Sequence, residues 1–429
     1  MIFSTIRKPA LVALGIVLAL VQAIPSSTLR AKPRSLSFDY NNQKVRGVNL
    51  GGWLVLEPWI TPSIFEKGGD AAVDEWTLTQ CLGKDGAQSL LSQHWNTFIT
   101  AADFQQISAA GMNHVRIPVG YWAVVPQPGD PYVQGQLDIL DQAIEWARAA
   151  DLKVIVDLHG APGSQNGFDN SGRRGSIDWD QDPTHVNITL DAIQALAERY
   201  AQYTDVVTII EALNEPMSVM GPSGVDLNTL KQFYYDSWGR IRAVNQDTVL
   251  AMHDGFQDID SWNGFMGPDS GVWNVMMDTH HYEVFDNGLL SDNTDQHVQS
   301  ACSFGKNKVS PTDKWTVVGE WTGAMTDCAK NLNGRGVGAR WDGSYGSGSS
   351  FHGSCNGYAQ GQVTDLSDDA RTDIRRFIEA QLDAFECHTG WLYWTWTTEG
   401  APEWDMKEQL ATGVFPNPVT ARQFPGQCD

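Results

Sequence analysis

Two glutamates are the residues of this chain whose setting is most suited to chemistry. Glu215 stands in Leu213-Asn214-Glu215-Pro216 and Glu320 in Val318-Gly319-Glu320-Trp321, and each follows a run of β-branched and apolar residues. Such runs predict buried strands, so each carboxylate is expected where a strand passes into a loop. One glutamate in that place is usually a surface charge, but two in matching contexts indicate paired work as proton donor and nucleophile.

Other strand ends carry polar residues that fit glycosidic chemistry. Arg116 lies in an apolar run and is expected to hold the nucleophile carboxylate ionised, with a purely structural ion pair as the alternative. Asn214 can hydrogen-bond a sugar 2-hydroxyl, a contact that strengthens as the ring approaches an oxocarbenium-like state. Tyr282 can hydrogen-bond the nucleophile or simply pack in the core.

Histidines also cluster at strand ends, at His159 and in His280-His281-Tyr282. The chain has neither a His-Glu-x-x-His motif nor a cysteine/histidine spacing typical of zinc, so we expect no metal. No Gly-x-Gly-x-x-Gly turn follows the first strand, which argues against a dinucleotide cofactor. Each histidine alone is more often a buried structural residue than a catalytic one.

The elements that must position these residues alternate between strand and helix. Strands are predicted at 45–52, 113–119, 153–159, 206–213, 248–254, 273–281, 315–320 and 390–396. Amphipathic helices are predicted between them, among others at 136–150, 190–203, 227–244 and 370–387. This order favours a single α/β domain, a closed (β/α)8 barrel with long strand-end loops, over an open doubly wound sheet.

Aromatic residues accompany the predicted strand ends. Alternation along the last strand places Trp394 and Trp396 on the same face, so that one inward tryptophan can stack under a sugar ring, whereas core packing accounts for others. Phe168 and Phe285 lie on loops after strands, where they can form an entrance clamp for a second sugar or pack the loop itself.

The start of the chain predicts export. A basic start, an uncharged apolar stretch over 10–21 and small residues after it indicate that residues 1–23 are a signal peptide, too short to favour a membrane span. A basic patch marks 24–34 as a candidate pro-segment, which leaves 35–429 as the catalytic domain. We therefore expect a secreted monomer, extracellular or in a cell wall.

The remaining chain is strongly acidic. Residues 1–34 contain five basic and no acidic residues, so the formal charge of -22 becomes -27 once they are removed. Such a surface repels nucleic acid and anionic membranes and favours a neutral substrate. Acidity can equally serve to keep a secreted protein soluble.

Six cysteines fit a few disulfides in an oxidising compartment. A stretch with nine glycines, Asn331 to Gly361, predicts a long loop on the strand-end face directly after Glu320, and Cys328 and Cys355 flank most of it. The one N-glycosylation sequon, Asn187-Ile188-Thr189, is expected to be occupied in a secreted chain.

Seven segments together closely resemble the fungal exo-β-1,3-glucanases of glycoside hydrolase family 5, over about Val45 to Cys428. They are Gly47 to Trp53, Arg116-Ile117-Pro118, Asp157 to Gly167, Leu213-Asn214-Glu215-Pro216, His280-His281-Tyr282, Gly319-Glu320-Trp321 and Trp394-Thr395-Trp396. Asn-Glu-Pro alone is moderately specific, whereas all seven segments in this order are highly specific.

The resemblance implies a retaining (β/α)8 enzyme without cofactor that removes glucose from the non-reducing ends of β-1,3-glucan by double displacement, with transfer to water or to another sugar. It implies that Glu215 is the acid/base and that Glu320 is the nucleophile. For the role of proton donor we expect a raised pKa at Glu215. Retention requires these two carboxyl groups to lie about 5 to 5.5 Å apart. The family's surrounding set is matched by Arg116, His159, Asn214, His280, Tyr282 and Trp394.

The resemblance also implies binding residues and disulfides. Glu57 and Asn170 are implied to hold the terminal glucose, with Phe168 and Phe285 as the clamp beyond the cleavage point. The implied disulfides are Cys302 to Cys428 and Cys328 to Cys355, with Cys81 and Cys387 unassigned. Trp59 is a departure, because relatives are expected to carry tyrosine there.

Two alternatives stay open. Specificity depends on loops, so an endo-acting, β-1,4-specific or β-1,6-specific glucanase on the same barrel fits the catalytic residues equally. A carbohydrate-binding wall protein with an inactive site is the other alternative, and the intact pair of glutamates argues against it.

Overall fold

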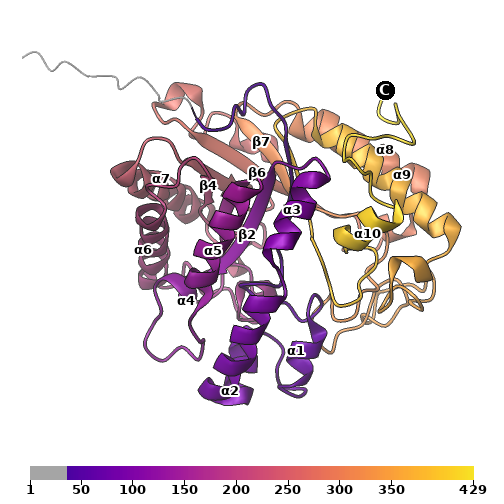
Figure 1. Cartoon of the computed structure of the whole chain (residues 1–429), viewed down its shortest axis with the longest axis horizontal. Coiled ribbons are helices and arrows are strands. Elements are labelled where there is room, and N and C mark those ends of the chain that lie inside the picture. Colours follow the sequence, from indigo (N-terminus) through magenta and orange to yellow (C-terminus); the bar gives the residue numbers. More distant parts are fainter. Residues whose placement is uncertain (1–35) are drawn as a thin grey trace, which may run out of the picture. The chain divides into compact units, whose positions relative to one another are not determined.

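The computed structural model describes residues 36–429, in which eight parallel strands close into a barrel in the order β1 to β8 (Figure 1). This confirms the predicted (β/α)8 fold. The expected signal peptide and pro-segment lie outside the described residues. Within residues 36–429, no helix is both long and apolar enough to cross a membrane.

All eight predicted strands are present. They are β1 Val45–Asn49, β2 His114–Gly120, β3 Lys153–Gly160, β4 Val207–Glu211, β5 Val249–His253, β6 Val275–His281, β7 Trp315–Trp321 and β8 Gly390–Tyr393. The strands β1, β4 and β8 end two or three residues earlier than predicted. At each of these ends the chain leaves the sheet for a loop at the carboxyl end of the barrel.

The helices surround the barrel. They are α1 Pro62–Glu66, α2 Glu75–Thr97, α3 Ala101–Ala109, α4 Tyr121–Val124, α5 Gln136–Ala149, α6 Pro183–Arg199, α7 Leu227–Val244, α8 Thr294–Phe304, α9 Asp368–Phe385 and α10 Met406–Thr412. The prediction for α7 is correct to the residue, but α6 begins seven residues before its prediction. Its start is set by Asp182, whose side chain accepts a hydrogen bond from Thr184 N, and by Pro183, which needs no partner in a first turn.

Side chains that alternate inward fill the barrel in layers. Near the amino ends of the strands the layer is apolar, and Phe38 and Tyr40 from the chain before β1 pack into it. Its strand residues include Val45, Ile155, Ile209, Val249, Met276, Val317 and Leu392. The amino end of the barrel is therefore closed by hydrophobic packing.

The next inward layer is charged. It consists of acidic side chains that follow the apolar-layer residues of β3, β4 and β6 by two positions. They are Asp157, Glu211 and Asp278, each at most 2% exposed. Arg116 of β2 lies among them and is fully buried. A charged layer thus separates the apolar floor from the carboxyl ends of the strands.

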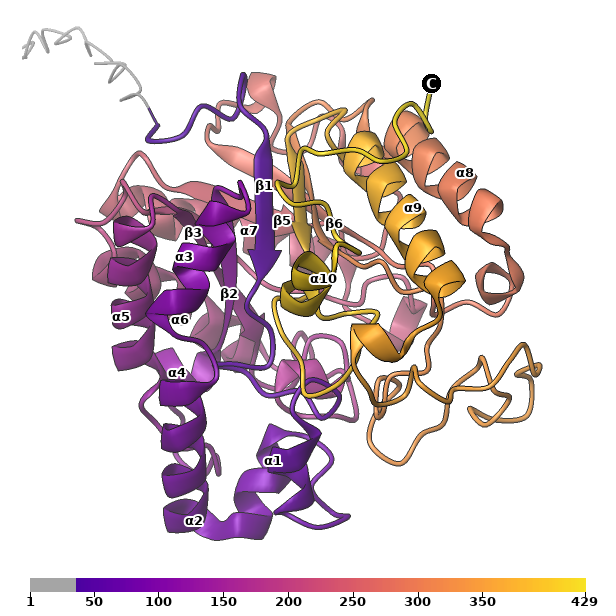
Figure 2. The same ribbon diagram turned by 45° about the vertical axis from the view of Figure 1, so that its right-hand side comes forward.

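The carboxyl ends of the strands face the long loops. In Figure 2 the arrowhead of β1 points to the end of the barrel where α1, α2 and the orange segment between β7 and α9 lie. That segment contains the predicted loop from Asn331 to Gly361. Disulfides join Cys328 to Cys355 and Cys302 to Cys428, as the resemblance implies, and both Cys81 and Cys387 are free thiols.

Candidate active site

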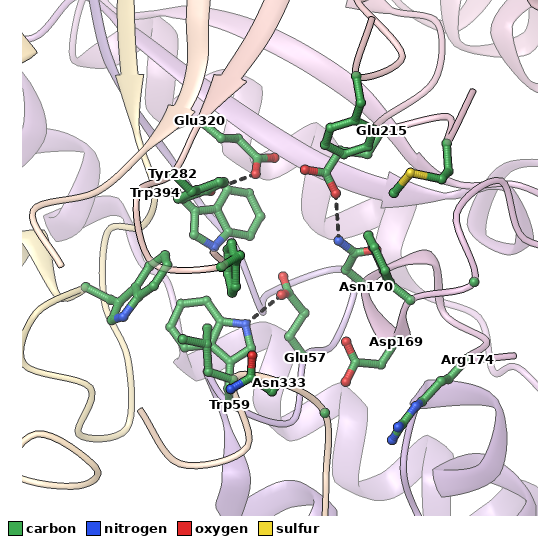
Figure 3. A pocket seen from close by; sticks show the side chains of 18 of the residues that line it. Glu57, Trp59, Asp169, Asn170, Arg174, Glu215, Tyr282, Glu320, Asn333 and Trp394 are labelled. Atoms are coloured by element: carbon green, nitrogen blue, oxygen red, sulfur yellow. Dashed lines mark hydrogen bonds between the residues drawn. The ribbon is translucent and has the colours of Figure 1, made fainter. Parts of the chain in front are cut away.

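The two glutamates lie at neighbouring positions of the carboxyl end of the barrel. Glu320 is in β7, and Glu215 follows β4 by four residues with a φ of 47°, a left-handed conformation that costs a non-glycine residue energy and that clusters at functional sites. Their side chains are buried, at 4% and 6% exposure. Figure 3 shows both carboxylates at the same wall of the pocket, with Glu57 across from them.

The separation of the two carboxylates follows from the histidine between them. His280 Nδ1 lies 2.8 Å from Glu215 Oε1 and 3.4 Å from Glu320 Oε2. These two oxygens are therefore no more than about 6 Å apart, close to the separation of retaining glycosidases and shorter than that of inverting ones.

Two donors fix the carboxylate of Glu320. Arg116 Nη1 donates to Oε1 at 2.8 Å, and the Tyr282 hydroxyl donates to Oε2 at 2.9 Å. Arg116 also donates to both oxygens of Glu211, at 2.6 and 3.1 Å, and to Asn214 Oδ1 at 2.8 Å. One guanidinium therefore contacts Glu320, where its charge favours the ionised carboxylate, and also forms a structural ion pair with Glu211.

The carboxylate of Glu215 has different partners. His280 Nδ1 donates to Oε1, and Asn170 Nδ2 donates to Oε2 at 3.2 Å. Asn170 was expected to hold a terminal sugar; it lines the cavity and also touches Glu215. In these contacts His280 is the cationic partner of Glu215, whereas Glu320 lies near both Arg116 and His280.

Protonation in this cluster depends on His280. Burial works against its charged form, but Glu320, Asp278 and Glu215 around it hold its pKa well above the usual range. Burial likewise favours protonated Glu215, yet the hydrogen bond and charge of His280 outweigh this and lower the pKa of Glu215. Burial raises the pKa of Glu320 to about 7 in spite of His280 and Arg116. The expectation of a raised pKa at Glu215 is therefore wrong for this arrangement, because the protonated His280 bonds Glu215 more closely.

His159 lies beneath the pocket in a fixed orientation. Burial lowers its pKa to about 3, so the ring is neutral, and its Nδ1 donates to Asp157 Oδ2 at 2.6 Å. Its Nε2 faces Asn214 Nδ2 at 3.5 Å. The ring stacks on Trp394 at 5.6 Å between centroids, with 6° between the planes. His159 thereby supports a tryptophan that lines the cavity.

The cavity has a volume of about 350 Å³. Of the predicted residues, those that line it are Glu57, Phe168, Asn170, Glu215, Tyr282, Phe285, Glu320 and Trp394. The other predicted site residues, Arg116, His159, Asn214 and His280, do not line the cavity. Arg116 contacts Glu320, His280 contacts Glu215, and His159 stacks on Trp394. Asn214 accepts a hydrogen bond from Arg116. Phe168 and Phe285 are 43% and 41% exposed, as a clamp at an entrance requires.

Glu57 is a further carboxyl group that lines the cavity. Burial and the nearby negative charge of Asp169 raise its pKa well above the usual range, so it is neutral and can both donate and accept hydrogen bonds. Trp59 Nε1 donates a hydrogen bond to Glu57 Oε2 at 2.8 Å, and the indole ring of Trp59 packs edge-on against Trp404. The tryptophan that departs from the expected tyrosine thus orients Glu57 directly.

The shared face predicted for Trp394 and Trp396 is wrong. Strand β8 ends at Tyr393, so strand alternation does not extend to these residues. Trp394 lines the cavity, whereas the indole of Trp396 donates to Asp103 Oδ1 of α3 at 2.9 Å. The sequon residue Asn187 is exposed, but it lies in α6.

Several residues of the site were not predicted. The loop after β7 contributes Leu332, Asn333, Arg340 and Tyr345 to the cavity wall. Beneath the cavity, Glu211 and Asp278 of the charged layer lie against Arg116. The sequence carries a signal for Glu211 and Asp278, because each is an acidic residue in an apolar strand. No such signal marks the loop residues, since a loop has no periodicity.

Two overlapping groups in the described chain bring three potential metal ligands within 4.8 Å, namely Glu215, His253 and His280, and Glu211, Asp278 and His280. Both groups need His280. In spite of burial, the surrounding carboxylates hold the pKa of this imidazole well above its usual range, so a metal ion would have to compete with a proton for the lone pair of the ring nitrogen.

Comparison with known proteins identifies the family. The model of the cellulase family, glycosyl hydrolase family 5, matches residues 82–339. The chain belongs to glycosyl hydrolase family 5. A protein named probable glucan 1,3-beta-glucosidase A from Aspergillus fumigatus is 59% identical over the full length of both chains. Glucan 1,3-beta-glucosidase from Blumeria graminis is 54% identical and covers 100% of this chain and 98% of its own.

Solved structures support the same fold at lower identity. The crystal structure of rutinosidase from Aspergillus niger superimposes with a TM-score of 0.69 at 22% identity, and covers 88% of this chain and 99% of its own. In a member of this family, the polar residues at the carboxyl ends of the strands are the natural candidates for catalysis.

Proposed function

We propose that this chain is a secreted, monomeric exo-β-1,3-glucanase that releases glucose from the non-reducing ends of β-1,3-glucan with retention, in the extracellular space or cell wall. The observation that carries the mechanism is the pair Glu215 and Glu320, about 6 Å apart or less across one histidine. The names of the similar proteins support the glucan specificity. The two disulfides support an oxidising compartment.

In the first step Glu320 attacks the anomeric carbon while Glu215 donates its proton to the leaving glycosidic oxygen. The C–O bond to the leaving sugar breaks, and a bond from the anomeric carbon to Glu320 forms. Arg116 and Tyr282 hold the attacking carboxylate at fixed angles through their two hydrogen bonds. In the second step Glu215 takes a proton from water, or from another sugar hydroxyl, which then displaces Glu320 from the anomeric carbon.

The roles require a proton on Glu215 and a charge on Glu320. His280 governs this order, because its Nδ1 is within reach of both carboxylates. In the structure His280 lies closer to Glu215, whose pKa is lowered, while burial raises the pKa of Glu320 to about 7. We propose that a closer contact of the imidazolium with Glu320 in the substrate complex reverses these two pKa shifts.

Exo action fits the shape of the cavity. Asn333, Arg340 and Tyr345 of the loop after β7 stand on its wall, together with Glu57 and Trp59. Asp327 binds this loop in place, since its carboxylate accepts the backbone N–H groups of Arg340 and Trp341 at 2.7 and 2.9 Å. We propose that this wall ends the cavity beyond the terminal glucose, so that a continuing chain is excluded.

Timed product analysis on laminarin tests the proposal and its alternatives. We expect glucose as the sole early product, released first as the β-anomer in NMR spectra. A ladder of oligosaccharides would instead indicate endo action, and α-glucose would indicate inversion. Turnover of β-1,4-glucan or β-1,6-glucan in preference to laminarin would indicate specificity for another linkage. If no glucan were hydrolysed, the alternative of a carbohydrate-binding protein with an inactive site would be supported.

Removal of the disulfide Cys328 to Cys355 by serine substitution is expected to lower both stability and substrate affinity. The bond closes a separation of 27 residues. The loss of that constraint on the unfolded chain corresponds to about 3.5 kcal/mol. The same bond holds the loop that bears Asn333, Arg340 and Tyr345, so KM for laminarin should rise. Calorimetry and steady-state kinetics measure the two effects.

The matched control is serine substitution of Cys302 and Cys428, which removes a disulfide between α8 and the end of the chain. This variant should be destabilised at least as much because its loop is longer, at a separation of 126 residues, but its KM should stay unchanged. An equal rise of KM in both variants would contradict the role of the loop as a wall of the cavity.

Glutamine at His280 is expected to move the pH profile of kcat/KM to higher pH. The substitution removes the imidazolium that lowers the pKa of Glu215 and opposes the rise at Glu320, so both pKa values increase. Both limbs of the profile report apparent pKa values of this coupled pair of carboxyl groups, so both limbs shift upward. The rate at the optimum should fall roughly 10- to 100-fold. His281→Gln is the control, because His281 binds Glu283 instead, and its profile should match wild type.

A further inference from the structure

The strand that bears Glu320 contains an irregularity directly before it. Along β6 and β7, Thr279 pairs with Val318 and the next residue, His280, pairs with Glu320. Gly319 is therefore an extra residue without a partner on β6, which makes it a bulge. Bulges are frequent beside active sites, where they change the direction of a side chain.

The bulge is what turns Glu320 into the barrel. Val317 belongs to the inner apolar layer and Val318 to the outer hydrophobic cluster. Regular alternation would continue with Gly319 inward and Glu320 outward, toward the helices. The extra residue reverses the order, so Glu320 faces Arg116 inside the barrel while Trp321 packs outside.

Both backbone groups of Gly319 are held by side chains. Its N–H donates to Asp278 Oδ1 at 2.8 Å, and its carbonyl accepts from Asn49 Nδ2 at 2.8 Å. Asp278 and Asn49 are buried, at 2% and 0% exposure. A buried peptide group without such partners would cost about 1 to 3 kcal/mol. These contacts therefore favour the bulged conformation over the regular strand.

The space inside the bulge is filled by the same carboxylate. A Cβ atom at Gly319 would overlap both oxygens and Cγ of Asp278. Only glycine at this position thus lets the Asp278 side chain reach the backbone N–H. The two residues form one interlocking unit beneath the catalytic carboxylate.

The residues that hold the bulge also touch the cations of the site. Asp278 Oδ2 lies 3.6 Å from His280 Nε2 and 3.9 Å from Arg116 Nε. Asn49 Oδ1 accepts from Arg116 Nη1 at 3.1 Å. The position of Glu320 and the positions of its charge partners are therefore set by the same two side chains.

We propose that Asp278 and Asn49 are positioning residues of the nucleophile, which hold the bulge at Gly319 and thereby aim the carboxylate of Glu320 at the anomeric carbon. This inference rests on the proposed function. A displacement of the nucleophile by about 1 Å costs roughly 100-fold in rate, because attack needs a near-attack geometry. Neither residue lines the cavity, so substrate affinity should be little affected.

Kinetics of Asp278→Ala, Asp278→Asn and Asn49→Ala on laminarin test the proposal. We expect kcat to fall about 100-fold in Asp278→Ala and about tenfold in Asn49→Ala, with KM within about twofold of wild type. Asp278→Asn keeps an oxygen for the Gly319 N–H, so it should regain most of the lost kcat. The control is Glu386→Gln, which removes a carboxylate bound by Arg46 beside the start of β8, and its kcat should stay within about twofold of wild type.

A double-mutant cycle gives an independent readout. Gly319→Ala alone should lose activity because its methyl group overlaps Asp278, whereas Gly319→Ala in the Asp278→Ala background should cost little more. Additive losses, wild-type kcat in Asp278→Ala, or equal changes in kcat and KM would each overturn the proposal. Failure of the wild-type protein itself to release glucose would instead reject the proposed function.

Discussion

Substitution of Glu320 by alanine is expected to reduce glucose release from laminarin by at least about 1,000-fold, because no other group can form the bond to the anomeric carbon. The loss should be equally severe on an aryl β-glucoside with a good leaving group, since easier departure of the aglycone does not replace the nucleophile. Stability should not fall, because the substitution relieves a buried carboxyl group whose pKa burial raises to about 7.

An external anion gives the decisive measurement. Azide is small enough to enter the space left by the carboxylate and to attack the same face of the sugar. Displacement of the aglycone by azide then inverts the anomeric carbon, so the product should be α-glucosyl azide. Recovery of β-glucosyl azide, or laminarin turnover within about tenfold of wild type, would show that Glu320 is not the nucleophile.

The eight-stranded barrel could be predicted because its signals are local. Each strand is a short apolar run between helical periodicities, and the two glutamates stand out at the ends of such runs. Arg116 was found because a charge in an apolar strand is unusual. The same signal marks Asp157, Glu211 and Asp278, each of which follows an inward apolar residue by two positions. Because side chains two positions apart in a strand share a face, strand alternation predicts that these three also point into the barrel.

What the sequence could not provide depends on contacts between distant segments. Regular strand alternation predicts that Glu320 points away from the barrel interior. Only the pairing of β6 with β7 reveals the bulge that directs its side chain inward. The wrong pKa direction at Glu215 has a similar origin, because His280 comes from another strand. Trp396 was misplaced because the end of β8 depends on the loop that follows it.

The acid/base residue should respond differently from the nucleophile. Glu215→Ala is expected to lose at least about 1,000-fold on laminarin, whose leaving sugar needs a proton, but to retain most of its first-step rate on 2,4-dinitrophenyl β-glucoside, whose leaving group needs none. The second step then lacks its base, so a burst of dinitrophenolate should precede a slow steady state. This selective loss distinguishes a proton donor from a residue that merely binds substrate.

Azide completes the contrast between the two glutamates. In Glu215→Ala the glycosyl-enzyme on Glu320 is intact, and azide attacks it from the face that the leaving group has vacated, so the product should be β-glucosyl azide and the steady-state rate should rise. Asn170→Ala is the matched control, because it removes the 3.2 Å hydrogen bond to Glu215 but keeps the carboxyl group itself, and it should give no azide product. Equal losses of Glu215→Ala on laminarin and on the dinitrophenyl glucoside would contradict the assignment.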